Sequence, residues 1–133
     1  FNVSQIEEAR RKYPNVRVLV HPECTMEVVQ AADLNGSTEF IKKAIEDSAS
    51  GSVWAVGTEV SLVNRLAVEN PSKIVFSLDP VVCPCSTMYR IHPAYLAWVL
   101  DGLNEGVALN KITVDPETAT DARSALDRML AIA

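Results

Sequence analysis

The chain has 133 residues, of which 48% are hydrophobic and 22% charged, a composition typical of a single globular domain with a buried core. The formal net charge is −5, and the basic run Arg10-Arg11-Lys12 falls on a predicted helix, which disfavours nucleic-acid binding. The apolar runs are too short to cross a bilayer, which argues against a membrane protein.

Helical and strand patterns alternate along the chain. Amphipathic helices are predicted over residues 3–13, 25–32, 37–47, 59–69, 93–104 and 116–131. Short apolar strands are predicted over residues 16–20, 33–34, 52–56, 73–78 and 111–114. Such alternation is typical of α/β proteins, in which helices cover both faces of a parallel sheet. The sequence therefore predicts a three-layer α/β/α fold with a short parallel sheet, followed by C-terminal helices.

Polar residues at three of the predicted helix starts match N-cap positions. Ser4 and Glu7 have the spacing of a capping box in the first helix. Thr58 is the predicted N-cap of a later helix, and Glu59 in its first turn suits the helix dipole. Asp115 is predicted to cap the last helix.

An imidazole, a carboxylate and a thiol follow the first predicted strand as His21, Glu23 and Cys24. Open α/β sheets bind their ligands at the carboxyl ends of the strands, where the flanking helices leave a hollow. The sequence therefore predicts a site at this strand end. The alternative is the ordinary polarity of a loop that follows a strand.

Gly36-Ser37-Thr38 stands directly before a predicted helix. Free backbone N–H groups at a helix start, together with two hydroxyl groups, form an anion site, and glycine lets a phosphate approach the backbone closely. The alternative is that Ser37 serves only as an N-cap. The tripeptide is not a Walker loop, because no Gly-Lys-Ser/Thr follows it.

The three cysteines are an odd number, which disfavours a closed disulfide framework and favours a reducing compartment. Cys83 and Cys85 are one residue apart in a proline-bearing loop, where a thiolate can bind a soft metal or an iron–sulfur cluster. A zinc site made by Cys83, Cys85 and His92 is a less favoured alternative, because the one-residue spacing makes its geometry awkward. Buried structural thiols are another alternative.

Taken together, these motifs resemble the quinolinate synthases of NAD biosynthesis. The motifs that carry the resemblance are His21-Pro22-Glu23-Cys24, Ala32-Asp33, Gly36-Ser37-Thr38, Gly57-Thr58-Glu59 and Cys85-Ser86-Thr87-Met88. The similar positions in the tail are Ala122, Ala125, Leu126, Met129 and Leu130. The motifs spread over nearly the whole chain, so their combination is specific although each one alone is weak.

The resemblance implies an architecture larger than this chain. The family has three similar α/β layers around a pseudo-threefold axis, with the active site at their centre. Residues 1–82 are then expected to be the third layer, and residues 83–133 the cluster-ligand loop and C-terminal helical tail. Phe1 is not a natural start, which agrees with a C-terminal portion of a longer protein.

The resemblance also implies a reaction. Iminoaspartate condenses with dihydroxyacetone phosphate, phosphate is lost, and two dehydrations lead to quinolinate. A 4Fe-4S cluster is held by three cysteines, one from each layer, and its open iron position acts as a Lewis acid. The expected compartment is the cytoplasm, or a plastid for a plant protein. The expected partners are these two small molecules, the missing N-terminal layers and a further copy of the chain, with neither nucleic acid nor membrane.

Residue roles follow from the resemblance, position by position. Cys85 matches the third cluster ligand, because Met88 follows it at the family's C-x-x-M spacing, although the additional Cys83 complicates the assignment. His21 and Glu23 match residues that contact the substrate. Glu23 is the better candidate for proton transfer, and His21 for positioning a carboxylate or hydroxyl group.

Ser37 and Thr38 match residues that bind the phosphate or carboxylate of the substrate, whereas Cys24 is not implied to be a cluster ligand. Two cluster cysteines and a lid tyrosine belong to segments absent here, so the isolated chain is predicted to be inactive and to hold no cluster. The alternative is a non-catalytic α/β module that binds a small anion at Ser37-Thr38 or a protein partner.

Overall fold

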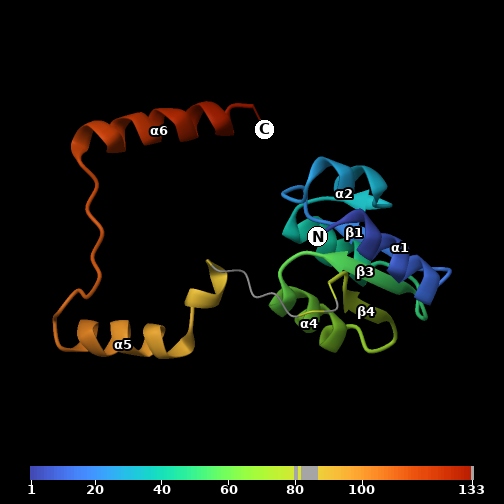
Figure 1. The fold of residues 1–133 in the computed structure, drawn as a ribbon. Helices are drawn as coiled ribbons and strands as arrows, with labels where there is room; N and C mark the ends of the chain where they lie inside the picture. Colours follow the sequence, from blue (N-terminus) through green and yellow to red (C-terminus); the bar gives the residue numbers. More distant parts are fainter. Residues whose placement is uncertain (80, 82–86, 133) are drawn as a thin grey trace. The chain divides into compact units, whose positions relative to one another are not determined.

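The computed structural model describes residues 1–79, 81 and 87–132, which form two compact units, Phe1–Tyr89 and Arg90–Ala133 (Figure 1). The first unit is an α/β structure, and the second contains two helices. The predicted boundary between residues 82 and 83 falls among residues that the structure does not describe. Within the described part of the chain, no helix has the length and apolar character needed to traverse a bilayer.

A four-stranded parallel sheet forms the centre of the first unit. Its strands, in spatial order, are β2 (Leu34–Asn35), β1 (Arg17–Val20), β3 (Val53–Gly57) and β4 (Ile74–Ser77). The register pairs Val20 with Asn35 on one side and with Gly57 on the other, and Val56 pairs with Ser77. The carboxyl ends of all four strands therefore meet at one edge of the sheet, as the alternating pattern predicts.

Helices cover both faces of the sheet, which confirms the predicted three-layer arrangement (Figure 1). The helices of the first unit are α1 (Val3–Lys12), α2 (Met26–Ala31), α3 (Thr38–Glu46) and α4 (Val60–Glu69). The buried side chains that α1 and α2 contribute to one face are Ile6, Ala9 and Val28. Those that α3 and α4 contribute to the other face are Ile41, Ile45, Val63 and Leu66.

Side chains of the central strands alternate between the two apolar clusters. In β1, Val18 and Val20 pack towards α1 and α2, whereas Leu19 packs towards α3 and α4. This alternation is the two-residue period of a strand, and both faces are apolar because both are covered. The continuous apolar runs that predicted these strands are thus explained by burial on both faces.

Trp54 of β3 is the largest fully buried side chain and lies in the cluster beneath α3 and α4. Its indole Nε1–H lies 3.1 Å from the hydroxyl oxygens of both Ser48 and Ser52, which themselves are 2.9 Å apart. The Arg17 guanidinium stacks over the ring at 4.6 Å from its centroid. The polar atom of this large side chain is therefore satisfied although the residue is inaccessible to solvent.

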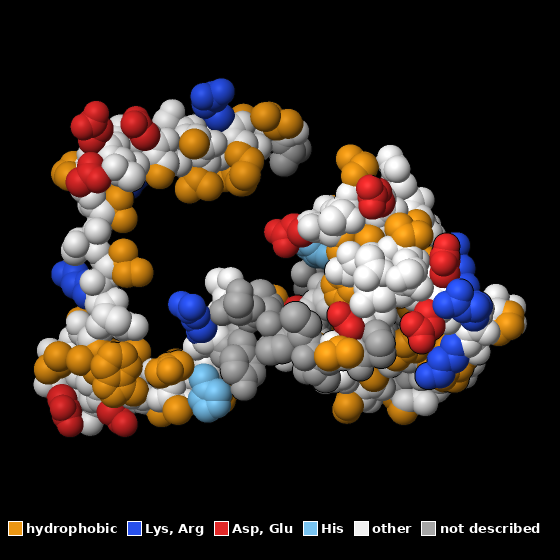
Figure 2. Space-filling model, viewed as in Figure 1, with side chains coloured by type: hydrophobic (Ala, Val, Ile, Leu, Met, Phe, Trp, Pro, Cys, Tyr) orange, Lys and Arg blue, Asp and Glu red, His pale blue; other side chains and the backbone are white. Residues whose placement is uncertain are grey.

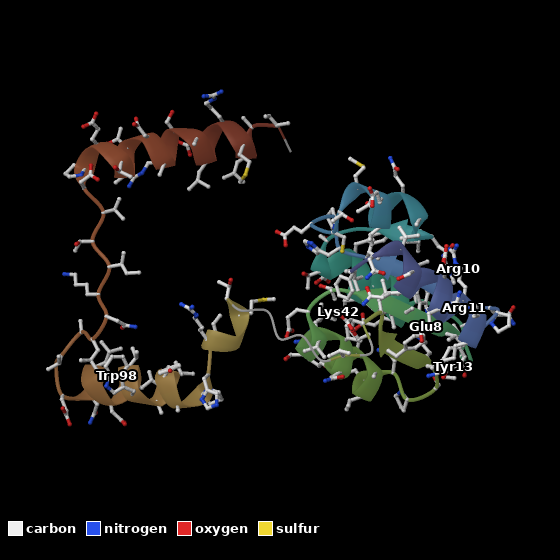
Figure 3. All side chains as sticks on the ribbon, viewed as in Figure 1. Glu8, Arg10, Arg11, Tyr13, Lys42 and Trp98 are labelled. Carbon is white, nitrogen blue, oxygen red and sulfur yellow. The ribbon has the colours of Figure 1, made fainter. Side chains whose placement is uncertain are left out.

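Asp33 joins the edge of the sheet to α1. Its Oδ2 accepts a 2.7 Å hydrogen bond from the Val18 N–H, and its own N–H donates to the Val18 carbonyl at 3.0 Å. Its Oδ1 accepts a 2.9 Å hydrogen bond from Arg10 of α1, which Figure 3 labels beside Arg11. The ion pair is 46% and 39% exposed, so it adds little to stability and chiefly fixes where α1 and the β2 edge lie.

The N-cap of the first helix lies two residues before the predicted cap, Ser4. Asn2 is the N-cap of α1, its Oδ1 accepting from the Gln5 N–H while the Gln5 side chain accepts from the Asn2 N–H. The capping-box prediction for Ser4 and Glu7 was therefore wrong. Both pairs have the same three-residue spacing, and the Ser4 hydroxyl instead donates to Asn2 Oδ1 at 2.6 Å.

Two other caps differ in their outcome. Glu59, and not Thr58, is the N-cap of α4, because its carboxylate reaches the N–H groups of Ser61 and Leu62 at 2.8 and 3.1 Å. Asp115 caps α6 as predicted, with its Oδ1 accepting from the Thr118 N–H at 2.9 Å.

The second unit contains α5 (Pro93–Asn104) and α6 (Pro116–Leu130), close to the bounds that the sequence predicts. A short 3-10 turn, Met88–Arg90, precedes α5 in the chain. The predicted strand 111–114 was wrong, since this segment adopts no regular structure. Its apolar side chains Ile112 and Val114 are exposed, and no described strand pairs with it to satisfy its backbone groups.

Both helices of the second unit expose apolar side chains. Among the described residues, α5 buries only Gly102 and α6 buries none. Figure 2 shows hydrophobic side chains gathered over α5. The large side chains of the two helices that are at least half exposed are Tyr95, Leu96, Trp98, Leu100, Leu103, Leu126, Met129 and Leu130. The unit by itself therefore lacks the packed core that would cover these helices.

Candidate active site at the strand ends

A hollow of about 580 Å³ opens at the carboxyl ends of β1, β3 and β4, all within the first unit. It is lined by Phe1, His21, Glu23, Cys24, Thr25, Thr38, Gly57, Thr58, Glu59, Val60, Ser77, Asp79, Val81 and Met88. The strands stop at this edge, and the starts of α3 and α4 border the hollow. This is the position at which open α/β sheets hold their ligands.

The turn formed by residues 21–24 brings His21 and Glu23 into the hollow directly after β1. The His21 ring Nδ1 accepts a 3.3 Å hydrogen bond from the Glu23 N–H, which assigns the proton of the neutral ring to Nε2. Glu23 Oε2 lies 3.7 Å from the same Nδ1. A protonated ring would therefore face a carboxylate, whereas a neutral ring can donate from Nε2.

The two side chains differ in their access to solvent. The side chain of Glu23 is 90% exposed, and that of His21 is 25% exposed. An exposed carboxylate is free to reach a substrate placed in the hollow, whereas the imidazole is held by its surroundings. Proton transfer by Glu23 and positioning by His21, the roles that follow from the resemblance, stay predictions.

Cys24 also lines the hollow and is partly buried. Its Sγ lies 3.6 Å from the Gly57 carbonyl oxygen, to which the S–H donates, and its N–H donates to the His21 carbonyl at 3.0 Å. Burial raises the pKa of this thiol. Cys24 is thus a neutral thiol near pH 7 and a poor ligand for a metal, which requires the thiolate.

The raised pKa of Cys24 gives a pH-dependent prediction. The folded chain retains the thiol proton better than the unfolded chain, so the stabilising contribution is intact below the ordinary thiol range and is lost as the pH rises above it. In a Cys83→Ser/Cys85→Ser variant, the rate of Cys24 alkylation by iodoacetamide should reach half its maximum at a higher pH when folded than in urea. Equal midpoints in the two states would contradict the predicted shift.

The start of α3 places only one of its two predicted residues in the hollow. Thr38 lines it, whereas Ser37 is not among the lining residues. The Ser37 hydroxyl accepts from the Phe40 N–H at 3.3 Å as the N-cap of α3. The structure therefore shows Ser37 in the role of the alternative interpretation, as an N-cap. A contact between Ser37 and a ligand stays a prediction.

Glu59, Asp79 and Met88 also line the hollow. The Glu59 carboxylate accepts hydrogen bonds from the N–H groups at the start of α4. Asp79, which follows β4, was missed as a site residue, although the logic applied to His21 would have found it. Its Oδ1 accepts from the Val81 N–H at 2.8 Å. Cys83 and Cys85 lie outside the described residues, and Met88 lines the hollow.

Comparison with known proteins indicates the same family as the sequence motifs do. Residues 1–131 match the family model described as quinolinate synthetase A protein. The chain is 56% identical over 132 residues to the quinolinate synthase of Corynebacterium glutamicum, 51% over 133 residues to that of Geobacillus thermodenitrificans, and 50% over 133 residues to that of Herpetosiphon aurantiacus.

These matches cover almost the whole chain but only part of each relative. They include 99% of this chain and 34% of the Corynebacterium protein, and 100% of this chain and 36% of each of the other two. The chain therefore spans about a third of the length of the curated relatives it matches.

Proposed function

Because the chain belongs to the quinolinate synthase family, we propose that it is one part of an enzyme that condenses iminoaspartate with dihydroxyacetone phosphate to give quinolinate in NAD biosynthesis. Its activity is then a property of the complete protein, since the chain spans about a third of its relatives. The assignment of this part to the third layer and C-terminal tail stays a prediction.

The observation that carries the proposal is the convergence of His21, Glu23 and Thr38 on one hollow. These residues come from the end of β1 and the start of α3, and the parallel sheet alone brings them together. In the proposed reaction, Glu23 transfers protons to and from the condensing carbon and its oxygen substituents. His21 orients a substrate carboxylate or hydroxyl group through Nε2–H, and Thr38 with the α3 N-terminus holds an anionic group.

The iron–sulfur cluster of the family does not fit the described residues of this chain by themselves. No group of three His, Cys, Asp or Glu side chains among residues 1–79, 81 and 87–132 is placed to hold a metal ion. Cys24 is neutral and donates to a carbonyl oxygen. We therefore propose that a cluster is held only in the complete protein, with Cys85 as this chain's ligand and cysteines of the remaining layers as the others.

The remaining layers of the same protein are also the proposed partner of the second unit. Its helices present half-exposed apolar side chains that a soluble protein normally covers, here Tyr95, Trp98 and Leu130. The isolated chain should therefore tend to self-associate, and the complete protein should bury these side chains.

Cluster assembly tests this proposal. After anaerobic reconstitution with iron and sulfide, the complete protein should gain the visible absorption of thiolate-to-iron charge transfer, and the isolated chain should not. The reason is that Cys85 alone among the three cysteines of this chain matches a cluster ligand, and that Cys24 is a neutral, partly buried thiol. Stoichiometric cluster absorption in the isolated chain would overturn the proposed division of ligands.

Two matched variants of the complete protein separate this proposal from the non-catalytic alternative. Cys85→Ser should abolish the cluster, and Cys24→Ser should leave its iron content unchanged. If both variants retain the same iron content as the unsubstituted protein, Cys85 is not a ligand and the anion-binding module becomes the better description.

A further inference from the structure

One backbone oxygen anchors the turn that carries the predicted active-site side chains. The Gly57 carbonyl, at the end of β3, accepts a 3.0 Å hydrogen bond from the His21 N–H and a 3.6 Å contact from the Cys24 S–H. The Cys24 N–H returns to the His21 carbonyl at 3.0 Å and closes the turn. Both ends of the 21–24 turn are thus fastened to the neighbouring strand.

The close approach at this point requires glycine. Gly57 pairs directly with Val20 across β1 and β3. A Cβ added at Gly57 would lie 2.8 Å from Val20 Cγ1 and 3.3 Å from Val20 Cβ, and Val20 is fully buried. Any side chain at position 57 would push β1 away from β3 directly before His21. The geometry of the turn therefore depends on the absence of a side chain at Gly57, on the strand next to β1.

We infer that Gly57 and Cys24 are positioning residues that hold His21 in its orientation towards the hollow, an inference that rests on the proposed function of His21. Gly57 supplies the acceptor and the close strand approach, and Cys24 supplies the second donor. The thiol must keep its proton to donate, and burial at this position favours the protonated form. Both residues line the hollow, and the role inferred for them acts through the turn rather than through contact with the substrate.

The imidazole of His21 can be observed directly in the 133-residue chain. The sequence has two histidines, so ring nitrogen signals in ¹⁵N NMR are resolved, and His92 serves as the internal control. His92 caps α5, accepting from the Ala94 N–H at 3.1 Å, and belongs to the second unit. In the unsubstituted chain, at a pH high enough for the ring to be neutral, the His21 signals should be those of the tautomer protonated at Nε2.

Cys24→Ala should shift the His21 Nδ1 and Nε2 signals towards averaged tautomers and speed hydrogen exchange of the His21 backbone N–H by severalfold. Cys24→Ser, which restores a donor, should return both towards the original values. Gly57→Ala should produce the larger change, and Val20→Ala in the same chain should reverse much of it by removing the clashing methyl group. The His92 signals should stay unchanged in all these variants.

The results separate the positioning role from the proposed function. Unchanged His21 signals and exchange in Cys24→Ala would overturn the inference, and this variant decides the matter even if Gly57→Ala does not fold. If the His21 ring signals shift in Cys24→Ala and do not return towards their original values in Cys24→Ser, the inference would also be overturned. In the complete protein, Cys24→Ala should lower kcat more than it raises KM. If Cys24→Ala shifts the His21 ring signals but leaves kcat unaltered, the positioning role of Cys24 is supported and the proposed role of His21 in the reaction is contradicted.

Discussion

Replacing Glu23 by glutamine in the complete protein is expected to lower kcat by about a hundredfold or more, the usual contribution of a general acid or base. The carboxylate is 90% exposed and lines the hollow beside His21, so the substitution removes proton transfer without disturbing a packed core. The measurement is the rate of quinolinate formation from iminoaspartate and dihydroxyacetone phosphate. Binding of the substrates should change far less than turnover.

The matched control is Glu27→Gln, which removes another exposed carboxylate four residues further along the chain. Glu27 lies in the first turn of α2 and does not line the hollow. It should leave turnover close to that of the unsubstituted protein. Equal losses in the two variants, or full activity of Glu23→Gln, would show that Glu23 does not carry the proton transfer.

Trp54→Ala is expected to lower the free energy of unfolding by about 3–5 kcal/mol, the range measured for truncating a buried aromatic side chain. The indole is fully buried between the sheet and the helices α3 and α4. Its removal also deprives Ser48 and Ser52 of a shared donor, although these hydroxyl groups retain each other at 2.9 Å. Urea unfolding followed by far-UV circular dichroism measures the change.

The sequence contains one other tryptophan, which provides the control. Trp98 lies on α5, is 50% exposed, and is labelled in Figure 3. Trp98→Ala should lower the stability of the isolated chain much less than Trp54→Ala does. Trp54→Phe should retain most of the buried volume and therefore lose less stability than the alanine variant. A small effect of Trp54→Ala would contradict the packing described for this face of the sheet.

The layered fold was predictable because each helix and strand leaves a local, periodic pattern of apolar residues in the sequence. The apolar run Val18-Leu19-Val20 indicates a strand buried on both faces, and α5 was found at the residues where its helical pattern begins and ends. The strand predicted at 111–114 failed because an apolar pattern cannot say whether another strand is available to pair with it. The cap of α4 failed because a hydroxyl at Thr58 fits the pattern as well as the longer carboxylate of Glu59.

The residues of the candidate site were predictable where their position depends on the end of a strand. They were less predictable where it depends on the direction in which a side chain points. His21 and Glu23 follow a recognisable strand, so their place at the sheet edge follows from the topology alone. Adjacent residues at a helix start diverge in direction, so Ser37 caps α3 while Thr38 faces the hollow. The anchoring of the turn at Gly57 arises from pairing between segments far apart in the sequence, which no local pattern records.

The carboxylate of Asp33 has a consequence for how the molecule behaves in concentrated solution. β2 is only two residues long, so no strand among the described residues pairs with the first half of β1 on that side. Exposed strand edges recruit strands from other molecules and start aggregation. At Val18, both backbone groups are already taken by Asp33, one by its side chain and one by its N–H. A single acidic residue thus blocks edge-to-edge association where the sheet would otherwise be open.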